Sequence, residues 1–299
     1  MEKIILKNDL DQEIYLLKLK NKRNKVIKII KNFEKKERKR KEEKIYKYLR
    51  KIFPDKFSYN KIKKILRNNY CDIYSEIFIE GETLYDFLDK YDLQEEASKE
   101  LVDILYALYK VPITKQIYQY LKISRKFDWA DYLNNNFDRF INTIEREQSL
   151  TKQTIYCLKK FWKKNKYLLK DVKKLTLLHN DLNQNNILLK IEKYNVVKCK
   201  IFDFEWCIIG DPIKDLSKLV WTFRKYPIFK GTFFSFYKKK FFFLEKIEEK
   251  LEIYWIYDMV RHIHQKKKLL KIKVWEQYLA EEKNILENYF KKEDDKWNI

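Results

Sequence analysis

Two apolar runs joined by a short polar connection constrain the fold more than any other stretch of this 299-residue chain. The runs are residues 187–191 and 196–204, and the connection is residues 192–195. Runs of this length with a polar connection predict an antiparallel hairpin. The residue before the first strand of a hairpin lies beside the residues that end the second strand. We therefore expect Asn186 and Asp203 to meet at one end.

A cluster of polar side chains, which includes His179, Asp181 and Asn186, comes directly before this hairpin. The amide oxygen of Asn186 and the carboxylate of Asp203 are hard ligands that can share one hard cation, with Asp181 close by. Such a group suits phosphoryl transfer, in which magnesium neutralises charge and one carboxylate orients the attacking hydroxyl. A plainer interpretation is that Asp181 and Asn186 satisfy loop backbone groups and that Asp203 only ends a strand.

Three motifs in order resemble the catalytic core of the aminoglycoside phosphotransferase and choline kinase family. The pattern H-x-D-x-x-x-x-N is met by His179, Asp181 and Asn186, and D-F/W-E/D/G is met by residues 203–205. The later pattern G-D-P-x-x-D-L is met by residues 210–216. The resemblance implies an α+β, two-lobed protein-kinase-like fold. Its small β-rich N-terminal lobe would carry one helix, and its larger C-terminal lobe would be mainly helical.

The resemblance also implies a role for each motif residue. Asp181 would be the catalytic residue that orients the substrate hydroxyl, and Asn186 and Asp203 would hold Mg²⁺. His179 and Asp215 would give structural support, because the later aspartate of the family braces the catalytic loop through hydrogen bonds. ATP or GTP would be the co-substrate.

Short alternating apolar runs predict a small three-stranded sheet at the start of the chain. The runs are residues 4–6, 14–19 and 26–30. The period of two places Lys28 on the opposite face from its apolar neighbours. Lys28 also matches the lysine that contacts nucleotide phosphates in the family that this chain resembles. A solvated lysine on an edge strand would give the same pattern.

The charged run 31–51 carries apolar residues at the spacing of one narrow helical face. This spacing predicts a helix packed on the small sheet. In the resembling family this helix carries a glutamate that pairs with the strand lysine. Glu42 is the best match for a partner of Lys28, and Glu37 and Glu43 are alternatives.

An apolar strand pattern ends at Gly81 and resembles the hinge between the two lobes of the family. Backbone groups of that hinge hold the edge of adenine, and the candidates here are Ile77 and Ile79. A plain buried strand would show the same pattern. We expect residues 1–80 to form the nucleotide-binding lobe and residues 81–299 to form the catalytic and substrate-binding lobe.

Composition bears on the alternatives to a small-molecule enzyme. The formal net charge of +22 favours a nucleic acid or an anionic membrane as partner. However, glycine and proline, which have GC-rich codons, number only three and four. The basic excess therefore reflects genome composition in part, and we expect no nucleic-acid partner. With no export signal, no apolar run long enough for a membrane span and no closely paired cysteines, we expect a cytoplasmic protein.

Together these features predict a magnesium-dependent kinase that transfers the γ-phosphate of ATP or GTP to a hydroxyl of a small molecule. By resemblance the acceptor is cationic and aminoglycoside-like, and a strongly basic protein would need a local acidic cleft to bind it. The candidate carboxylates are Asp181, Asp203, Glu205, Asp211 and Asp258. One alternative is a choline- or ethanolamine-type kinase that holds the ammonium on Tyr254, Trp255 or Tyr257. The other is a catalytically inactive kinase-like binding protein.

Overall fold

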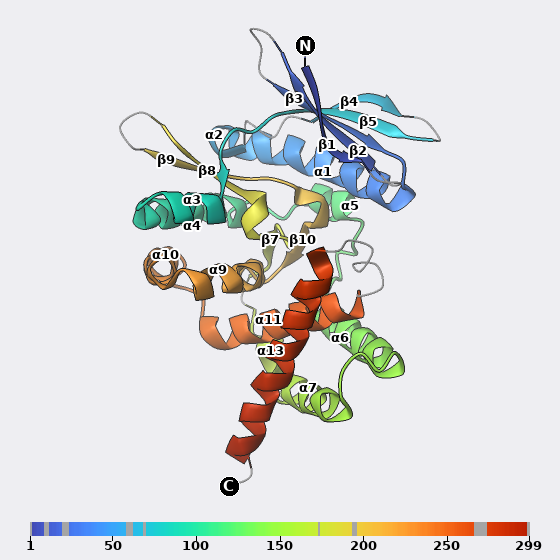
Figure 1. The fold of residues 1–299 in the computed structure, drawn as a ribbon, viewed down its shortest axis with the longest axis vertical. Helices are drawn as coiled ribbons and strands as arrows, with labels where there is room; N and C mark the ends of the chain where they lie inside the picture. The colour runs from blue at the N-terminus through green and yellow to red at the C-terminus, as the bar shows by residue number, and fades with distance from the viewer. Residues whose placement is uncertain are drawn as a thin grey trace.

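The computed structural model describes residues 2–8, 12–19, 24–57, 62–67, 70–172, 174–192, 196–265 and 274–297. These residues form two parts: a small antiparallel sheet with one long helix beneath it, and a larger, mainly helical part (Figure 1). This is the α+β, two-lobed architecture that the sequence predicts.

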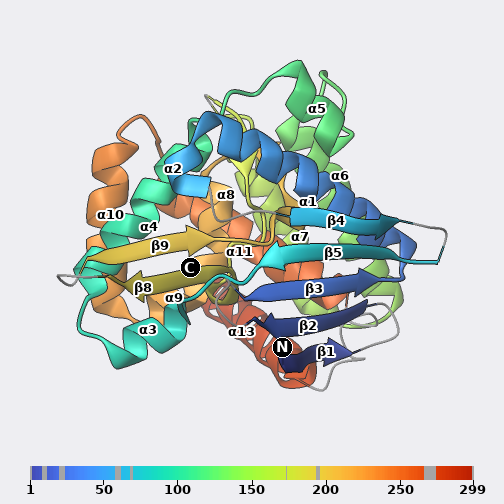
Figure 2. The same cartoon turned by 90° about the horizontal axis from the view of Figure 1, so that it is seen from above.

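Five antiparallel strands form the sheet of the smaller part, side by side in the order β1, β2, β3, β5, β4 (Figure 2). Their bounds are Glu2–Asn8 for β1, Gln12–Lys18 for β2, Lys25–Ile30 for β3, Ile62–Arg67 for β4 and Asp72–Ile77 for β5. The three strands predicted at the start of the chain are confirmed as β1, β2 and β3. Strand β4 lies at one edge and exposes Lys63, Lys64 and Arg67, charges that oppose pairing with another sheet.

Helix α1 (Phe33–Ile52) runs beneath the sheet and is followed by the short helix α2 (Pro54–Phe57). Asn32 caps α1, because its Oδ1 accepts a hydrogen bond of 3.1 Å from the backbone N of Lys35. Ile45 and Leu49, one helical turn apart, are both fully buried. Their burial confirms the predicted helix and fixes which of its charged residues face inward.

The chain changes its sheet partner directly after the predicted hinge. Strand β6 (Glu82–Thr83) pairs with β8 (Ile187–Ile191) of the larger part instead of extending the first sheet. Gly81 precedes it with a φ of 152°, and a Cβ there would lie 3.0 Å from the backbone oxygen of Leu189. Only glycine fits this close approach.

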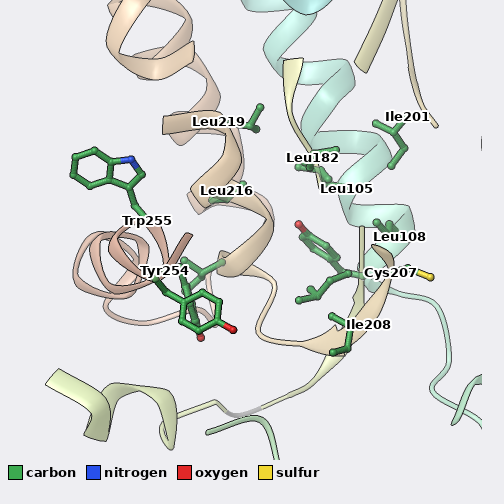
Figure 3. Close-up of a cluster of buried hydrophobic side chains, with 14 of the residues drawn as sticks. Leu105, Leu108, Leu182, Ile201, Cys207, Ile208, Leu216, Leu219, Tyr254 and Trp255 are labelled. Carbon is green, nitrogen blue, oxygen red and sulfur yellow. The ribbon is translucent and has the colours of Figure 1, made fainter. Parts of the chain in front are cut away.

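Helices make up most of the larger part. They are α3 (Leu84–Lys90), α4 (Gln94–Tyr109), α5 (Lys115–Leu121), α6 (Trp129–Arg146), α7 (Lys152–Asn165), α8 (Ile213–Leu216), α9 (Val220–Lys225), α10 (Pro227–Lys240), α11 (Ile247–His264) and α13 (Val274–Trp297). Leu105 and Leu108 of α4 belong to a buried cluster with Leu182 and Ile201, and Tyr254 and Trp255 leave α11 in different directions (Figure 3). None of the helices in the described ranges is long and apolar enough to cross a membrane.

The predicted hairpin is confirmed as strands β8 and β9 (Val197–Ile201), which pair antiparallel with Ile187 opposite Ile201. Part of its connection, residues 193–195, lies outside the described residues. The pairing continues past the strand ends, because the backbone N of Phe202 donates to the backbone O of Asn186 at 3.1 Å. Asn186 therefore lies beside the chain that leads into Asp203, as the sequence predicts.

Candidate active site

The polar loop before β8 is anchored by a buried carboxylate. Asp215 Oδ2 accepts a hydrogen bond of 2.9 Å from the backbone N of His179, and its Oδ1 accepts one of 2.6 Å from the backbone N of Asn180. Asp215 is completely buried, and this burial raises the pKa of its carboxyl group. The two backbone donors offset part of that effect. The geometry is the bracing arrangement that the resemblance implies for Asp215.

His179 connects the same loop to the end of β9. Its Nε2 lies 2.8 Å from the backbone O of Phe202, and its Nδ1 accepts a hydrogen bond of 3.3 Å from the backbone N of Asp181. Because Nδ1 is the acceptor, Nε2 is the nitrogen that donates to Phe202. The ring is fully buried against Phe204, with the ring centroids 4.5 Å apart. His179 thus positions the backbone of Asp181 from inside the fold.

Asp181 and Asn186 are joined directly. The Nδ2 of Asn186 donates to the backbone O of Asp181 at 2.8 Å and to its Oδ2 at 3.2 Å. Since the amide nitrogen of Asn186 is used in this way, its Oδ1 is the atom left to serve as a ligand. The loop therefore places a carboxylate and an amide oxygen next to each other.

Asp203 is positioned from the smaller part of the molecule. Its backbone has a φ of 71°, and its backbone N donates to the hydroxyl of Tyr46 on α1 at 2.7 Å. The carboxylate of Asp203 and the amide oxygen of Asn186 are hard oxygen ligands of the kind that Mg²⁺ prefers. No group of three His, Cys, Asp or Glu side chains that could hold a metal occurs in the described ranges. A magnesium ion here would take its other ligands from nucleotide phosphates and water.

The predicted ion pair between Lys28 and Glu42 is wrong in this structure. Lys28 Nζ lies 3.2 Å from Oε2 of Glu76 on the neighbouring strand, and Glu42 Oε2 lies 2.6 Å from Nζ of Lys39, one turn earlier on α1. Lys39 also contacts Glu76. Two lysines and two glutamates therefore form one chain of ion pairs. Lys39, which is almost completely buried, takes the partner that the sequence assigned to Lys28.

Burial and neighbouring charge shift the pKa values of Glu42 and Glu76 in opposite directions. Burial raises the pKa of Glu42, while the charge of Lys39 works in the other direction. Burial would also raise the pKa of Glu76, but Lys28 and Lys39 outweigh it and hold that pKa at about 2. Glu76 is thus the carboxylate that stays ionised beside Lys28.

The two alternative partners from α1 have other contacts. Glu37 Oε1 lies 2.7 Å from Nη1 of Arg40, and Glu43 Oε1 lies 2.9 Å from Nζ of Lys47 on the exposed side of the helix. The carboxylate that pairs with Lys28 therefore comes from the sheet and not from the helix.

The hinge candidates lie where the sheet ends. Ile77 is the last residue of β5 and is paired with Lys25 of β3. The backbone N of the next residue, Phe78, donates to the backbone O of Asn24 at 3.0 Å. Ile77 and Ile79 flank this bond and are both partly buried. The segment therefore continues beside the residue that precedes β3 before the chain enters the larger part.

A cavity of about 570 Å³ opens beside Asp181 in the larger part. Its walls come from the polar loop, from the residues that follow α8, and from α11 and α13. Three tryptophans, Trp206, Trp221 and Trp255, line it together with Asp181. Its volume lies within the range of roughly 300–1,000 Å³ that is typical of small-molecule sites. The cavity thus places a ligand-sized space against the predicted catalytic carboxylate.

The sequence-based candidates for an acidic cleft do not come together in one place, since Asp203 and Glu205 are half-buried and do not line this cavity. Asp181 and Asp258 line the cavity. Asp211 is only 1% exposed and accepts a hydrogen bond of 2.9 Å from the hydroxyl of Tyr254, which is itself fully buried. Among the candidate aromatic residues, Trp255 is on the cavity wall. Of these two neighbours on α11, Tyr254 therefore belongs to the core and Trp255 belongs to the cavity wall.

Basic side chains at the cavity were not anticipated from the sequence. Asp258 is surrounded by Lys214 Nζ at 2.7 Å, Arg261 Nη2 at 3.6 Å and Lys218 Nζ at 4.0 Å. Although burial opposes it, these three cations hold the pKa of Asp258 far below its usual range. Lys218 lies three residues after Asp215, so the motif could have pointed to it. No sequence signal connects it to Arg261, which lies on α11.

Several solved structures have a fold similar to that of this chain. One structure with a similar fold is a complex of an aminoglycoside 2"-phosphotransferase with GDP and kanamycin, with a TM-score of 0.72, 14% identity, and coverage of 96% of this chain and 92% of that one. Another is the ternary complex of such an enzyme with streptomycin and ATP, with a TM-score of 0.63, 19% identity, and coverage of 88% and 86%. A third, the aminoglycoside phosphotransferase APH(4)-Ia, has a TM-score of 0.65, 10% identity, and coverage of 96% and 92%.

These similarities show that the fold is the kinase-like fold of the aminoglycoside phosphotransferases. No curated protein matches the chain. The phosphotransferase enzyme family, in contrast, matches residues 4–237, which is most of the chain and includes all three motifs. The chain belongs to this family, and it is a small-molecule kinase whose acceptor is an alcohol group.

Proposed function

We propose that the protein uses magnesium and a nucleoside triphosphate to phosphorylate a hydroxyl of a small molecule bound in the cavity beside Asp181. One observation carries this proposal: Asp181 lines the cavity and is also hydrogen-bonded to Asn186, a candidate metal ligand. The acceptor space and the metal ligands thus meet at a single carboxylate. That is the geometry required for a hydroxyl to attack a metal-bound phosphate.

In the proposed reaction, Asp181 accepts the proton of the acceptor hydroxyl as the hydroxyl oxygen bonds to the γ-phosphorus. The bond from that phosphorus to the β,γ-bridging oxygen breaks, and the nucleoside diphosphate leaves with the bridging oxygen. Asn186 and Asp203 would hold a magnesium ion, which supplies charge neutralisation on the phosphates when bound. Asn186 also keeps Asp181 oriented through the hydrogen bond from its Nδ2.

Nucleotide binding is proposed for residues 1–80, and the acceptor and catalytic sites for residues 81–299. Lys28 would contact the phosphates, and the ionised Glu76 beside it would keep the ammonium in place. Glu42 would act through Lys39, with which it is paired. The backbone groups of Ile77 and Ile79 would bind the base, and the nucleotide would be ATP or GTP. All four cysteines are free thiols, which suits the proposed cytoplasmic location.

The cationic acceptor that the resemblance suggests has limited support in the cavity. Four acidic residues line it, but Asp258 is paired with Lys214, and Glu282 lies 2.9 Å from the ring of His262. An aminoglycoside carries several ammonium groups and would need several carboxylates. We propose an acceptor with at most one ammonium group, which argues against polycationic aminoglycosides.

The test is a transfer assay with purified protein, magnesium and γ-labelled ATP or GTP against a broad set of small hydroxyl compounds. We expect label on at least one acceptor with wild-type protein and none with Asp181→Asn. If the protein binds magnesium-nucleotide but labels no acceptor in the set, the inactive binding-protein alternative is the correct one.

A further inference from the structure

Building on the proposed function, we infer that the acceptor carries a carboxylate in addition to its hydroxyl, and that Arg261 and Lys218 bind this carboxylate in the cavity. These two residues would be specificity determinants of the kinase. The inference rests on the charge balance around Asp258, on the occupied faces of the cavity tryptophans and on the positioning of the Lys218 ammonium.

Cations outnumber anions in the immediate surroundings of Asp258. Lys214, Lys218 and Arg261 face one carboxylate, that of Asp258. Lys214 and Ser217 both bind Oδ2 of Asp258, whereas Oδ1 has no hydrogen-bond partner within the described part of the chain and faces Arg261 and Lys218 at 3.6 and 4.0 Å. The longer separations to the other two cations leave them capacity for another anion. A buried surplus of positive charge is costly unless an anion compensates it.

The guanidinium of Arg261 has an unused donor. Its Nε is buried and has no hydrogen-bond partner within the described part of the chain. An arginine presents its donors in a planar fork that matches a carboxylate bidentately. Arg261 and Lys218 both line the cavity, and the charge of Asp181 acts on the pKa of both, so they lie near the catalytic carboxylate.

The Lys218 ammonium contacts His262, and that ring is in turn held by Glu282. Its Nζ lies 2.8 Å from Nε2 of His262, and Nδ1 of that ring lies 2.9 Å from Oε1 of Glu282 on α13. Burial lowers the pKa of His262 well below its usual range, with the charges of Lys218 and Arg261 adding to the effect. The neutral ring therefore donates from Nδ1 to Glu282 and accepts from Lys218 at Nε2. Such a buried, oriented ammonium suits anion binding.

The three tryptophan rings of the cavity already make cation–π contacts with arginine side chains of the protein itself. The guanidinium of Arg38 lies 4.4 Å from the ring centroid of Trp206. That of Arg224 lies 4.9 Å from the ring centroid of Trp255 and 5.6 Å from that of Trp221. An ammonium in the cavity would meet rings whose negative potential is partly neutralised. These walls offer an acceptor flat apolar contact more than cation binding.

The test uses matched acceptors that share one hydroxyl-bearing ring and differ in charge: glucuronate, glucose and glucosamine. Binding is followed by tryptophan fluorescence in the presence of magnesium and a non-hydrolysable nucleotide, and transfer is followed with γ-labelled nucleotide. We expect glucuronate to bind at least about tenfold more tightly than the other two, since a hydrogen bond to a charged group is worth about 1.5–3 kcal/mol.

Two variants link that preference to the proposed residues. Arg261→Gln and Lys218→Gln should each reduce glucuronate affinity by about tenfold or more while changing glucose affinity little. Arg261→Lys should restore part of the preference because it keeps the charge. Arg146→Gln, a change of an exposed arginine at the end of α6, is the control for overall charge and should behave like the wild type.

Each result bears on one of the two proposals. Equal binding of the three compounds, tighter binding of glucosamine, or no glucuronate response would overturn the inference. The same holds if both glutamine variants keep the wild-type preference. Glucuronate binding without transfer to any hydroxyl compound would support the carboxylate site and contradict the kinase proposal. Transfer that favours neutral or cationic acceptors would do the reverse.

Discussion

Lys28 and Glu76 form an ion pair across neighbouring strands, with Nζ and Oε2 separated by 3.2 Å. In the structure Glu76 therefore occupies the role of lysine partner that the sequence assigned to Glu42. Glu76 can pair with Lys28 because strands β3 and β5 are adjacent, so that a lysine and a glutamate on the same face of the sheet come within ion-pair distance of each other. Lys39 then joins the strand glutamate to the helix glutamate.

Glu76→Gln should make the free energy of unfolding fall less between neutral and acid pH than it does in the wild type. The pKa of Glu76 is lowered from 4.5 to about 2, so its contribution is present above pH 4.5 and is lost as pH falls through about 2. That contribution is on the order of 3 kcal/mol at neutral pH. Urea unfolding at pH 7 and at pH 3 should show a smaller difference for Glu76→Gln than for the wild type. Glu145→Gln, in an exposed ion pair, is the control, and equal pH dependence of all three proteins would contradict the prediction.

Asp181→Asn should lower the rate of transfer by about 10²- to 10⁴-fold, because it removes the base that accepts the hydroxyl proton. Asn keeps the volume and an acceptor oxygen for the hydrogen bond from Asn186, so the fold and the nucleotide affinity should change little. Steady-state transfer and calorimetric nucleotide binding check the two halves of this prediction. Asp138→Asn, on the exposed side of α6, should retain full activity. Wild-type turnover of Asp181→Asn would show that another group is the base.

Asp203→Ala and Asn186→Ala should each raise the magnesium concentration needed for half-maximal activity. The effect should be larger for Asp203→Ala, since it removes a full negative charge and not a neutral amide oxygen. Magnesium titrations at saturating nucleotide measure this. Asp92→Ala, at an exposed turn, controls for loss of a carboxylate. If calorimetry finds the magnesium-nucleotide affinity of Asp203→Ala unchanged, the metal role is wrong.

Asn180→Ala should destabilise the protein more than Asn180→Gly. Asn180 has a φ of 61°, and its Nδ2 donates to the backbone O of Trp206 at 3.1 Å. Both changes remove that hydrogen bond, but only alanine places a Cβ in the left-handed region, at a cost of about 1–2 kcal/mol. Thermal unfolding of the two variants measures the difference. An alanine variant as stable as the glycine variant would show that the loop relaxes to another backbone conformation.

The hairpin and its loop could be predicted because the information is local. Residues 186 and 203 are brought together by one antiparallel pairing, whose register follows from the alternation of apolar residues and from the polar connection. The same is true of the three N-terminal strands and of α1. In each case the apolar pattern and the helix, strand or hairpin that it predicts lie within one short segment of the chain.

The charge pairing and the acceptor cavity could not be predicted in this way. Lys218 and Arg261 are brought together only when α11 packs against the segment after α8, and Glu282 is added by α13. Their approach depends on helix packing and not on spacing along the chain. In a sequence this rich in lysine and glutamate, many pairings satisfy the same pattern, so the partner of Lys28 was decided by tertiary geometry.

Arg224→Gln should strengthen the binding of a simple quaternary ammonium ion in the cavity. The guanidinium of Arg224 lies within 5.6 Å of the ring centroids of both Trp221 and Trp255, so it competes with any ligand cation for their faces. Arg224 is exposed, so its removal leaves no buried charge without a partner. A cation–π contact at such a site is worth about 0.5–1 kcal/mol, which corresponds to an increase in affinity of about two- to fivefold. Quenching of tryptophan fluorescence by tetramethylammonium measures this affinity.

Arg224→Lys, which keeps the charge, should stay close to the wild type in its affinity for tetramethylammonium. If Arg224→Gln and the wild type bind the ion equally, the occupied ring faces are not what disfavours a cationic acceptor, and the charge of Lys218 and Arg261 alone must account for that selectivity.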